Sequence, residues 1–533
     1  MKHLNVPTLL IIALPFTLRA QAPPLAWEAF FDGSMPGLDE ARDILVASDN
    51  SVYVTGAAMH LVPQGTMTTV RYASDGTPLM ADHVYGPSQG TMNQGEALAM
   101  DAEGHVYVTG AFSANNGDMV LVKYGPNGRM WRENYEPYWF GSELDRAWDV
   151  AVGPDGKPCI AGSITSLSGM GLENFLLKAD TAGEQLWTDQ CSPSSADEWA
   201  TEVAVANDGS IYLAGHWWNT QGSSSIDVSV ARYTPAGLRL WNLGFPVPGS
   251  NDRATDIATT ANGDVVVCGM AQGSDGMDAL IFSRDADGNL LWSHVIDGNG
   301  IGNDEAVAVL ALPDGTVALA AHVMVQVGIQ SKNAVRLMVI DGADVLWAED
   351  YTGEAALGAW PTDLAVTSDG QLVVCGYETA AGGTTTDGLL LTYSPSGEQL
   401  WHAAYDAGAG ENDRFTGVAV NSAGDVVACG STYTSANTSR YVTVQFGHAV
   451  GIEQHDAGAT LHVRPSVTTV GQPVLISAPD VLHATCEIFD AGGRSVLRSV
   501  FNARLQWVPV TAGVYTVKLD QKGQQFSERL VVR

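Results

Sequence analysis

Basic residues are scarce in this sequence: 26 lysines and arginines stand against 59 aspartates and glutamates, a formal net charge of −33. Nucleic acids and anionic lipid surfaces are bound by Lys and Arg side chains that displace counterions. The composition therefore excludes nucleic acid and acidic membrane surfaces as partners. An acidic coat keeps a protein soluble and attracts divalent cations, but most of these carboxylates are interpreted as solvated surface.

Long apolar runs are also missing. The run from Leu9 to Leu18 is too short to span a bilayer, which takes ~20 residues, so no membrane-spanning segment is expected. It follows Lys2 and precedes the small-residue stretch Arg19 to Ala22, a pattern typical of an export signal. We expect residues 1–20 to be a signal peptide cleaved after Ala20, leaving a soluble monomer outside the inner membrane.

Catalytic motifs are absent as well. The sequence contains no GxSxG, HExxH or CxxC, and its histidines show no metal-ligand spacing. Asp285 to Asn289 begins like a calcium loop, but Ile296 stands where the twelfth-position Glu belongs, so a hairpin turn is expected there. No catalytic residue, metal ligand or cofactor is predicted. A glycosidase needs only two carboxylates ~5–9.5 Å apart, so that class stays open.

What the sequence does contain is a repeat. The phrases Asp208 to Gly215 (DGSIYLAG) and Gly237 to Trp241 (GLRLW) recur eight times at intervals of 51 to 56 residues. A period of this size is typical of repeat architectures. In the copy from Asp197 to Phe245, four short segments rich in β-formers are joined by Gly-containing turns, which predicts an antiparallel four-stranded sheet.

Eight such sheets predict an eight-bladed β-propeller, since a ring hides the sheet edges that a solenoid would expose. Trp27 to Phe31 supplies one outer strand, and the last copy before the tail supplies three. Together they complete an eighth blade. Seven blades are the alternative, if the weak sixth copy is degenerate. The repeated Trp is expected to pack between blades. Cysteines at equivalent places on different copies are too far apart to form disulfides and are expected to be small buried hydrophobes: Cys159, Cys268, Cys375 and Cys429.

Two of the four links in each copy are tight turns and two are long loops. Because strand direction alternates, both long loops lie on one face of the ring, and this face is the candidate binding surface. An acidic residue recurs where each inner strand begins, and such a ring of carboxylates suits Ca²⁺. The alternative is that each carboxylate accepts backbone N–H groups or pairs with an Arg. The recurring residues are Asp39, Glu96, Asp145, Asp197, Asp252, Asp304 and Asp413.

Aromatic residues concentrate in the loops of the third and fourth copies, around Tyr138 to Phe140 and His216 to Trp218. Exposed aromatic rings beside carboxylates stack on sugars and bind their hydroxyls. The alternative is a local hydrophobic cap under the long loops. The candidate ligand-binding residues are Trp139, Trp199, His216, Trp217, Trp218, Asp145, Asp197 and Asp252.

From Ile452 the period breaks and the acidic excess ends. Residues 21–451 are therefore expected to form the propeller, residues 452–459 a linker and residues 460–533 a second domain. Seven short predicted strands in that domain indicate a small immunoglobulin-like β-sandwich. They run from Leu461 to Arg464, Pro473 to Ser477, Thr485 to Asp490, Ser495 to Val500, Leu505 to Val508, Gly513 to Leu519 and Gln525 to Val532.

Two family resemblances follow from these phrases. Asp101 to Gly110 (DAEGHVYVTG) and Gly397 to Trp401 (GEQLW) resemble SBBP-type propeller repeats of secreted bacterial proteins. That likeness covers Trp27 to Gly447 and implies the fold but no single activity.

The tail resembles the C-terminal sorting domain of the type IX secretion system of Bacteroidetes, through Ile488 to Val496 (IFDAGGRSV), Ala512 to Leu519 (AGVYTVKL) and Arg529 to Val532 (RLVV). Arg464 to Ser466 replaces the usual Pro-Asn-Pro opening. This resemblance implies export by that machinery across the outer membrane, removal of the tail, and release or surface attachment of the body.

The sequence thus favours a secreted or cell-surface binding module for a glycan or another extracellular polymer, with an extracellular protein as a further possible partner. A polysaccharide-degrading hydrolase or lyase using loop-face carboxylates is one alternative. A structural or adhesive protein without a small ligand is another.

Overall fold

The computed structural model divides the chain into two compact units, residues 1–449 and 450–533. None of the described residues forms a helix long and apolar enough to cross a bilayer. The described residues are 22–60, 65–86, 93–112, 118–135, 145–165, 171–191, 198–219, 225–245, 251–273, 276–353, 355, 357–408, 410–435, 437–447, 462–464, 467–470, 472–477, 484–490, 494–501, 504–521 and 524–532.

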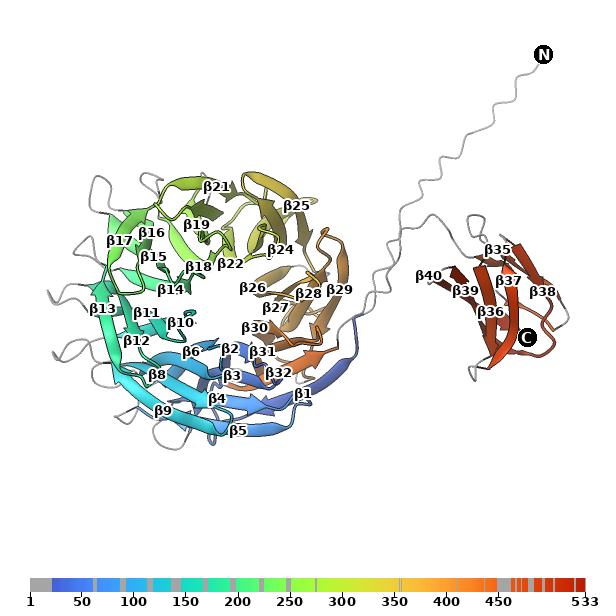
Figure 1. Ribbon diagram of the computed structural model, residues 1–533, viewed down its shortest axis with the longest axis horizontal. Helices are drawn as coiled ribbons and strands as arrows, with labels where there is room; N and C mark the ends of the chain where they lie inside the picture. The colour runs from blue at the N-terminus through green and yellow to red at the C-terminus, as the bar shows by residue number, and fades with distance from the viewer. Residues whose placement is uncertain are drawn as a thin grey trace, which may run out of the picture. The chain divides into compact units, whose positions relative to one another are not determined.

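The first unit is an eight-bladed β-propeller, a ring of eight four-stranded antiparallel sheets (Figure 1). Blade 1 contains β2 (Glu40–Val46), β3 (Val52–Met59), β4 (Gly65–Tyr72) and β5 (Pro78–Val84). Blade 2 contains β6 (Asn93–Met100), β7 (Val106–Phe112), β8 (Asp118–Gly125) and β9 (Gly128–Tyr135). Blade 3 contains β10 (Arg146–Val152), β11 (Pro158–Thr165), β12 (Leu172–Ala179) and β13 (Gln185–Gln190), and blade 4 contains β14 (Trp199–Val205), β15 (Ile211–Asn219), β16 (Ser225–Tyr233) and β17 (Arg239–Gly244).

Blade 5 contains β18 (Arg253–Thr259), β19 (Val265–Gln272), β20 (Met277–Arg284) and β21 (Leu290–Ile296). Blade 6 contains β22 (Glu305–Ala311), β23 (Val317–Val327), β24 (Gln330–Asp341) and β25 (Asp344–Tyr351). Blade 7 contains β26 (Ala359–Val366), β27 (Leu372–Thr379), β28 (Thr386–Tyr393) and β29 (Gln399–Tyr405), and blade 8 contains β30 (Asp413–Val420), β31 (Val426–Ser435), β32 (Thr438–Phe446) and β1 (Leu25–Phe31). The sixth copy is a complete blade, so the ring has eight blades rather than seven.

The ring closes through its two ends. The outermost strand of blade 8 is β1, which runs antiparallel to β32 with Trp27 opposite Gln445 and Phe31 opposite Tyr441. The predicted closure of the last blade by both ends of the repeat region is confirmed. Closing the ring pairs the strand edges that an open stack would leave exposed.

Neighbouring blades are joined at their periphery by the repeated tryptophan. Trp187 of blade 3 lies against Gly237 in the β16–β17 turn of blade 4, and its Nε1 donates to the Pro235 carbonyl at 3.3 Å. A Cβ on Gly237, whose φ is +89°, would come within 2.6 Å of the Trp187 ring, so this turn requires glycine. The same arrangement recurs at Trp27, Trp131, Trp241 and Trp347.

The innermost strand of every blade carries a β-bulge, visible as a register shift in its pairing with the second strand. A bulge leaves a backbone N–H without a ladder partner. In blade 1 the Asp43 carboxylate accepts hydrogen bonds from two such N–H groups. It accepts from Ile44 N at 2.7 Å in its own strand and from Leu98 N at 2.6 Å in blade 2.

The same double acceptance recurs in every second blade. The carboxylates are Asp43, Asp149, Asp256 and Asp363, spaced about 107 residues apart. They receive the bulge amides of blades 1 and 2, 3 and 4, 5 and 6, and 7 and 8 at 2.6 to 2.8 Å. Four aspartates therefore accept hydrogen bonds from eight backbone amides and connect the blades in pairs.

The second unit is a two-sheet sandwich. One sheet has the order β33-β35-β38 and the other the order β34-β40-β39-β36-β37. Val474 and Ile476 of the first sheet pack with Cys486, Ile488 and Val517 of the second. All seven strands expected from the sequence are present: β33 (His462–Arg464), β35 (Val474–Ser477), β36 (Ala484–Asp490), β37 (Ser495–Phe501), β38 (Arg504–Trp507), β39 (Gly513–Gln521) and β40 (Gln524–Val532), and β34 (Val467–Thr468) is added to them.

All six cysteines are free and buried, which confirms the prediction for Cys159, Cys268, Cys375 and Cys429. Cys268, Cys375 and Cys429 lie on the second strands of different blades, and their hydroxyl neighbours are threonines of the same blade.

Replacing a bridging carboxylate should weaken the ring. Asp363→Ala removes the acceptor of Leu364 N and Val418 N, and a buried donor without a partner costs about 1–3 kcal/mol. We expect the free energy of unfolding, measured with urea, to fall by that amount. Asp363→Asn, which keeps one oxygen acceptor, should lose less. The control Asp344→Ala, at an exposed position at the start of β25, should change it by no more than about 0.5 kcal/mol. Equal stability of Asp363→Ala and the control would contradict the bridging role.

Candidate functional site

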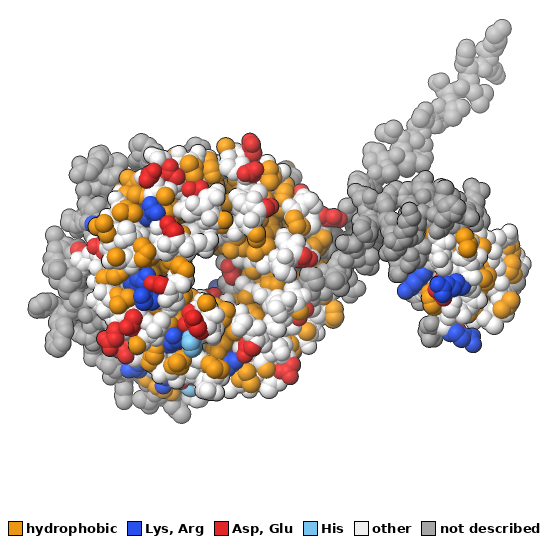
Figure 2. Space-filling model, in the orientation of Figure 1, with side chains coloured by type: hydrophobic (Ala, Val, Ile, Leu, Met, Phe, Trp, Pro, Cys, Tyr) orange, Lys and Arg blue, Asp and Glu red, His pale blue; other side chains and the backbone are white. Residues whose placement is uncertain are grey.

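The loop face of the propeller, which carries the β3–β4-type and blade-to-blade links, surrounds one end of a central opening. The opening is visible along the ring axis in the space-filling view (Figure 2). At this end, one residue near the start of each inner strand pairs with the residue that follows the repeat glycine, or that follows Ala321 in blade 6. We call these eight residue pairs the rim. Their inner-strand members are Glu40, Gln94, Arg146, Trp199, Arg253, Glu305, Trp360 and Arg414.

Two rim positions form aromatic pairs across the strands. Trp199 lies opposite His216, with ring centroids 5.0 Å apart. Trp360 lies opposite Tyr377 and stacks on it at 5.1 Å with an interplanar angle of 16°. The other side of Trp360 faces His322 of blade 6 at 6.4 Å, again at 16°. Both tryptophans are half-buried, so each presents part of a fixed ring to solvent.

His216 is a buried polar group of the rim, with 8% of its surface exposed. Burial, with a smaller contribution from Arg253, lowers its pKa to about 4, so the imidazole is neutral at pH 7. Its Nδ1 is buried and has no hydrogen-bond partner among the described residues. The neutral imidazole beside the tryptophan thus has one ring nitrogen that is buried and unpartnered among the described residues.

The rim of blades 1 to 3 is charged. Glu96 lies between two guanidinium groups, 3.2 Å from Arg42 Nη1 and 3.5 Å from Arg146 Nη2. The Arg146 guanidinium also lies 4.4 Å over the Trp148 ring. Burial raises the pKa of Glu96, and both arginines oppose that rise. The geometry therefore holds two arginines in fixed positions at the opening.

A second charged group joins blade 8 to blade 1. Arg414 Nη2 lies 3.5 Å from Glu40 and donates to the Tyr433 hydroxyl at 3.1 Å. Tyr433 donates in turn to Glu40 at 3.3 Å. Arg42, Arg146, Arg253 and Arg414 thus lie around one opening, each near a carboxylate of Glu40, Glu96 or Glu305.

The carboxylates that the sequence pointed to at the strand starts hold backbone amides. Asp145 accepts from Thr165 N at 2.9 Å and Asp252 from Gln272 N at 3.1 Å. Asp304 accepts from Gly298 N and Met324 N, both at 2.6 Å. Asp39 and Asp413 do the same in their blades. Asp39, Asp304 and Asp413 thus bind the loop that enters their own inner strand. Asp145 and Asp252 bind the end of the second strand of their blade. Acceptance of backbone N–H groups is the alternative foreseen for these residues.

One member of that series is misplaced by sequence spacing. β6 begins at Asn93, which stands at the capping position of blade 2, and Glu96 comes three residues later. In blade 4, Glu198 directly precedes β14, and Asp197 lies outside the described residues. Loops of unequal length shift the start of a strand, so in blade 2 a count from the repeat glycine misses the capping residue by three positions.

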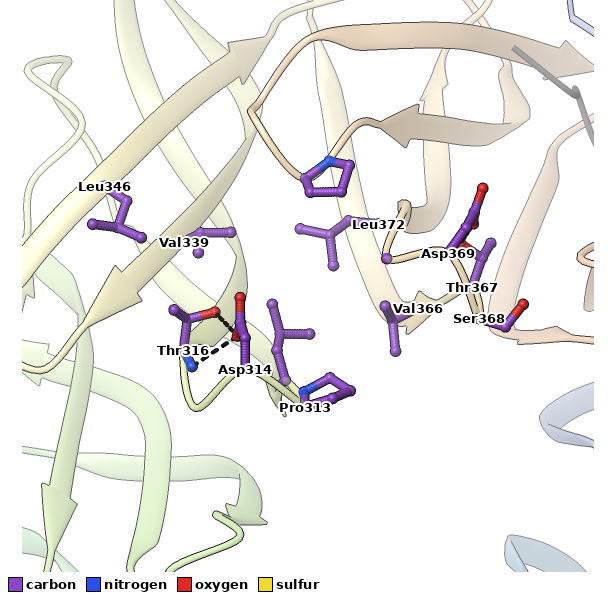
Figure 3. Close-up of a pocket in the computed structure, with 13 residues that line it drawn as sticks. Pro313, Asp314, Thr316, Val339, Leu346, Val366, Thr367, Ser368, Asp369 and Leu372 are labelled. Carbon is purple, nitrogen blue, oxygen red and sulfur yellow. Dashed lines mark hydrogen bonds between the residues drawn. The ribbon is translucent and has the colours of Figure 1, made fainter. Parts of the chain in front are cut away.

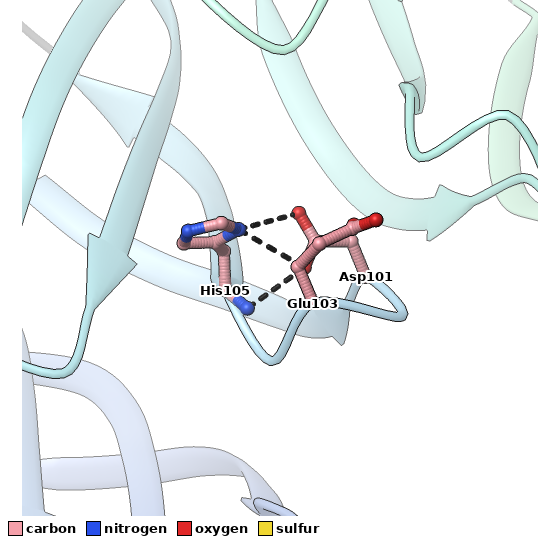
Figure 4. A group of neighbouring side chains, drawn as sticks. All are labelled: Asp101, Glu103 and His105. Carbon is pink, nitrogen blue, oxygen red and sulfur yellow. Dashed lines mark hydrogen bonds and ion pairs between the residues drawn. The ribbon is translucent and has the colours of Figure 1, made fainter.

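Among the described residues of the loop face, no cluster of potential Ca²⁺ ligands is present. The group of three potential metal ligands is Asp101, Glu103 and His105, on the opposite face that carries the tight turns (Figure 4). His105 Nδ1 lies 3.0 Å from Asp101 Oδ2, and the Lys123 ammonium lies 3.4 Å from the same oxygen. A buried lysine this close repels a metal ion, so the cluster is charge-paired without one.

The aromatic candidates separate. Trp199 and His216 meet at the rim, whereas Trp217 points to the opposite side of β15, where its ring lies against Gly244. Trp139 lies outside the described residues, and for Trp218 the structure describes only its place in β15.

Three rim aromatics were missed from the sequence: Trp360, Tyr377 and His322. Strand pairing could have identified Tyr377, because it follows the repeat glycine Gly376 as His216 follows Gly215.

Deeper in the opening, the bridging aspartates line the wall with Glu202. Burial raises the pKa of Asp43 and Asp256 to about 7 and that of Asp363 to about 6, with neighbouring carboxylates adding to the rise for Asp43 and Asp256. Burial also raises the pKa of Asp149, and burial together with Asp149 raises that of Glu202 well above its usual range. The ring of like charges therefore retains protons near neutral pH.

Comparison with known proteins gives no family assignment: no family model matches the chain, and no curated protein matches it. Among solved structures, the chain is similar to PorZ, a surface component of the type IX secretion system of Porphyromonas gingivalis (14% identity, 91% of this chain and 64% of that chain, TM-score 0.41). It thus spans less than two thirds of that protein.

The chain is also similar to the β-propeller domain of the Trilobed protease from Pyrococcus furiosus (13% identity, 66% and 93%, TM-score 0.39). A further similar structure is the periplasmic gluconolactonase PpgL of Pseudomonas aeruginosa (13% identity, 69% and 98%, TM-score 0.39). Likenesses at this level assign no activity to the chain.

The raised pKa values predict a pH dependence of stability. An unfolded Asp titrates near ~3.9, so between about pH 4 and pH 7 the folded ring binds more protons than the unfolded chain, and its contribution to stability falls as pH rises. We expect Asp256→Asn to gain stability relative to the wild type as pH increases from 4.5 to 7.5, in urea unfolding at constant ionic strength. The difference between the two proteins should be flat above pH 8. A difference that shrinks with rising pH would show that the carboxylate is not protonated in the folded state.

Proposed function

We propose that this chain is a secreted or cell-surface β-propeller that binds a glycan or another extracellular polymer at the rim of its loop face. The observation that carries this proposal is the Trp199–His216 pair, a half-exposed indole beside a buried imidazole whose Nδ1 has no partner among the described residues. Stacking on a sugar face together with one hydrogen bond to a hydroxyl is the usual chemistry of carbohydrate recognition.

Further groups on the same rim support an extended ligand. The Trp360–Tyr377 stack on blade 7 offers a second flat surface, and the exposed Arg253 on blade 5 lies between the two aromatic pairs in chain order. Guanidinium groups bind hydroxyl and carboxylate oxygens with fixed geometry. A polymer of several sugar units, including acidic ones, fits a surface on which aromatic and basic groups alternate in this way.

A polysaccharide-degrading enzyme is the second candidate function. It is favoured by one observation, the carboxyl pair Asp149 and Glu202 in the opening, where burial and their mutual repulsion raise the pKa of Glu202 well above its usual range. A protonated carboxyl beside a carboxylate is the arrangement that acid–base cleavage of glycosides uses. Release of reducing ends from a bound polysaccharide would select this function over binding alone.

We further propose that the second unit is a type IX sorting domain and that the propeller is its cargo. The phrases of β36, β39 and β40 carry this proposal, and they form the central strands of the larger sheet. The type IX machinery would then be the partner of residues 460–533, with residues 1–20 as the export signal.

Substitution of the rim aromatics tests the binding function. Trp199→Ala and Trp360→Ala should each weaken binding to the preferred glycan on an array at least tenfold, because each removes a stacking surface worth about 1.4 kcal/mol or more. Leu238→Ala, which changes a 65% exposed side chain on the tight-turn face, is the matched control and should bind like the wild type. Glycan binding that survives both Trp substitutions would refute the rim as the site.

Truncation tests the sorting domain separately. In a host with type IX secretion, the full chain should appear outside the outer membrane, and a chain ending at residue 451 should accumulate in the periplasm. Cell fractionation followed by immunoblotting measures this. Equal export of both chains would rule out a sorting role, whatever the propeller binds.

A further inference from the structure

On the tight-turn face, the junctions between blades are filled by a repeated pair of side chains. The third strand of blades 1, 2 and 4 supplies a cation that lies over a tyrosine of the second strand. The pairs are Arg71 over Tyr53 at 5.1 Å, Lys123 over Tyr107 at 4.7 Å and Arg232 over Tyr212 at 5.7 Å. Each pair fills the space between its own blade and the next.

The contacts of Arg232 show what such a cation binds. Its Nη2 donates to Ser210 Oγ at 2.9 Å, and its Nη1 donates to the Ala286 carbonyl of blade 5 at 2.6 Å. Asp208 lies 3.6 Å away. Arg71 repeats the set with Ser51 Oγ at 3.1 Å, the Pro126 carbonyl of blade 2 at 2.7 Å and Asp49 at 2.9 Å. The junction is therefore a site for a guanidinium that the chain occupies with its own arginine.

Blade 5 lacks both members of the pair. Strand register places Val266 where blade 4 has Tyr212, and Ser283 where blade 4 has Arg232. The space they leave is a cavity of about 400 Å³ between blades 5 and 6, and Ser283 and Trp292 are part of its wall. The cavity is thus the guanidinium site of blade 4 with the guanidinium removed.

The carboxylates of this cavity remain. Asp264 stands where blade 4 has Ser210, so the Ser–Arg pair of blade 4 becomes an Asp–Ser pair in blade 5. Asp314 and Asp341 also line the cavity, and none of its lining residues is basic. The Asp264 carboxylate takes part in no hydrogen bond or ion pair among the described residues, and burial followed by the charge of Asp285 raises its pKa. The Asp264 carboxylate thus faces the position that corresponds to the Arg232 guanidinium of blade 4.

The next junction provides a contrast. Between blades 6 and 7, Val339 takes the place of the arginine, and a cavity of about 350 Å³ is lined by apolar side chains that include Leu312, Leu346 and Leu372 (Figure 3). Asp314, on its edge, is already bound by the backbone and hydroxyl of Thr316. Loss of the cation alone therefore leaves an apolar hollow. Blade 8 also has an aspartate, Asp425, at the position of Ser210, but Gln445 stands where blade 4 has Arg232 and donates to Asp425 at 3.0 Å. Among the described residues, the junction of blades 5 and 6 combines the loss of the cation with a carboxylate that faces an open cavity.

We propose that the cavity between blades 5 and 6 binds an arginine side chain of an extracellular polypeptide partner. The guanidinium would lie against Trp292, pair with Asp264, and donate to the β24–β25 turn of blade 6 as Arg232 donates to the equivalent turn of blade 5. This site is independent of the glycan site, since it lies on the tight-turn face and shares no residue with the rim.

The test uses the full chain and two peptides, acetyl-Gly-Arg-Gly-amide and its citrulline analogue, which has the same shape without the charge. Calorimetric titration should show saturable binding of the arginine peptide and at least tenfold weaker binding of the citrulline peptide. Asp264→Asn should weaken the arginine peptide at least tenfold. Ser283→Arg, which fills the cavity as Arg232 does in blade 4, should abolish binding and raise the melting temperature.

Ser283→Ala is the control, because it leaves the cavity open and should bind like the wild type. If Ser283→Arg does not fold, Asp264→Asn and the citrulline peptide decide the matter. Equal binding of the two peptides, equal binding to the wild type and Asp264→Asn, or no saturable binding to the wild type would each overturn the proposal. Glycan binding should be unchanged in all three variants.

Discussion

One aspartate serving two bulge amides is the interaction on which this propeller depends. Every innermost strand must bulge as it lines the central opening, and each bulge leaves an N–H turned away from its ladder. Asp43, Asp149, Asp256 and Asp363 each accept one such amide from their own blade and one from the next. The structural unit is therefore a pair of blades, repeated four times, and this explains why the aspartate recurs about every 107 residues while the blades recur at half that interval. The arrangement also buries four carboxyl groups around one opening, and this burial is the main cause of their raised pKa values.

The periphery is joined by different chemistry. There the indole N–H of one blade binds the turn carbonyl of the next, and the turn glycine allows the ring to approach. Closure by β1 and β32 lets both systems run around the ring without an open edge. Because the inner strands are fixed at the bulge, the residues just before it are held at constant height around the opening. The rim is made of these residues, and the scaffold is the reason that scattered side chains such as Trp199, Arg253 and Trp360 share one surface.

Much of this architecture could be predicted from the sequence, because the signals are local. The Gly and Trp phrases mark turns and outer strands, and the count of strands at the two ends gives the closure. The site was harder, because it depends on which residues face one another across strands. Trp199 and His216 were chosen for being aromatic and do meet, but Trp217, their neighbour in sequence, points to the other side of its sheet. Trp360 and Tyr377 have the same cross-strand relation and were missed, since the position after the repeat glycine reveals the pair only when the register of the two strands is considered. The bridging aspartates follow a two-blade period that is invisible when single repeats are compared. The cavity beside Asp264 is revealed only by what fills the equivalent place in another blade.

Amide hydrogen exchange at single-residue resolution tests the shared-carboxylate arrangement most directly. Leu98, Val203, Val309 and Val418 have their bulge amides bound by a carboxylate from the preceding blade, whereas Ile44, Val150, Ile257 and Leu364 have theirs bound within the same strand. If one carboxylate serves both, all eight amides should be protected to the same degree as the neighbouring sheet ladder. Fast exchange at the four amides of blades 2, 4, 6 and 8, with protection at the other four, would contradict the pairing of blades on which this description of the ring rests.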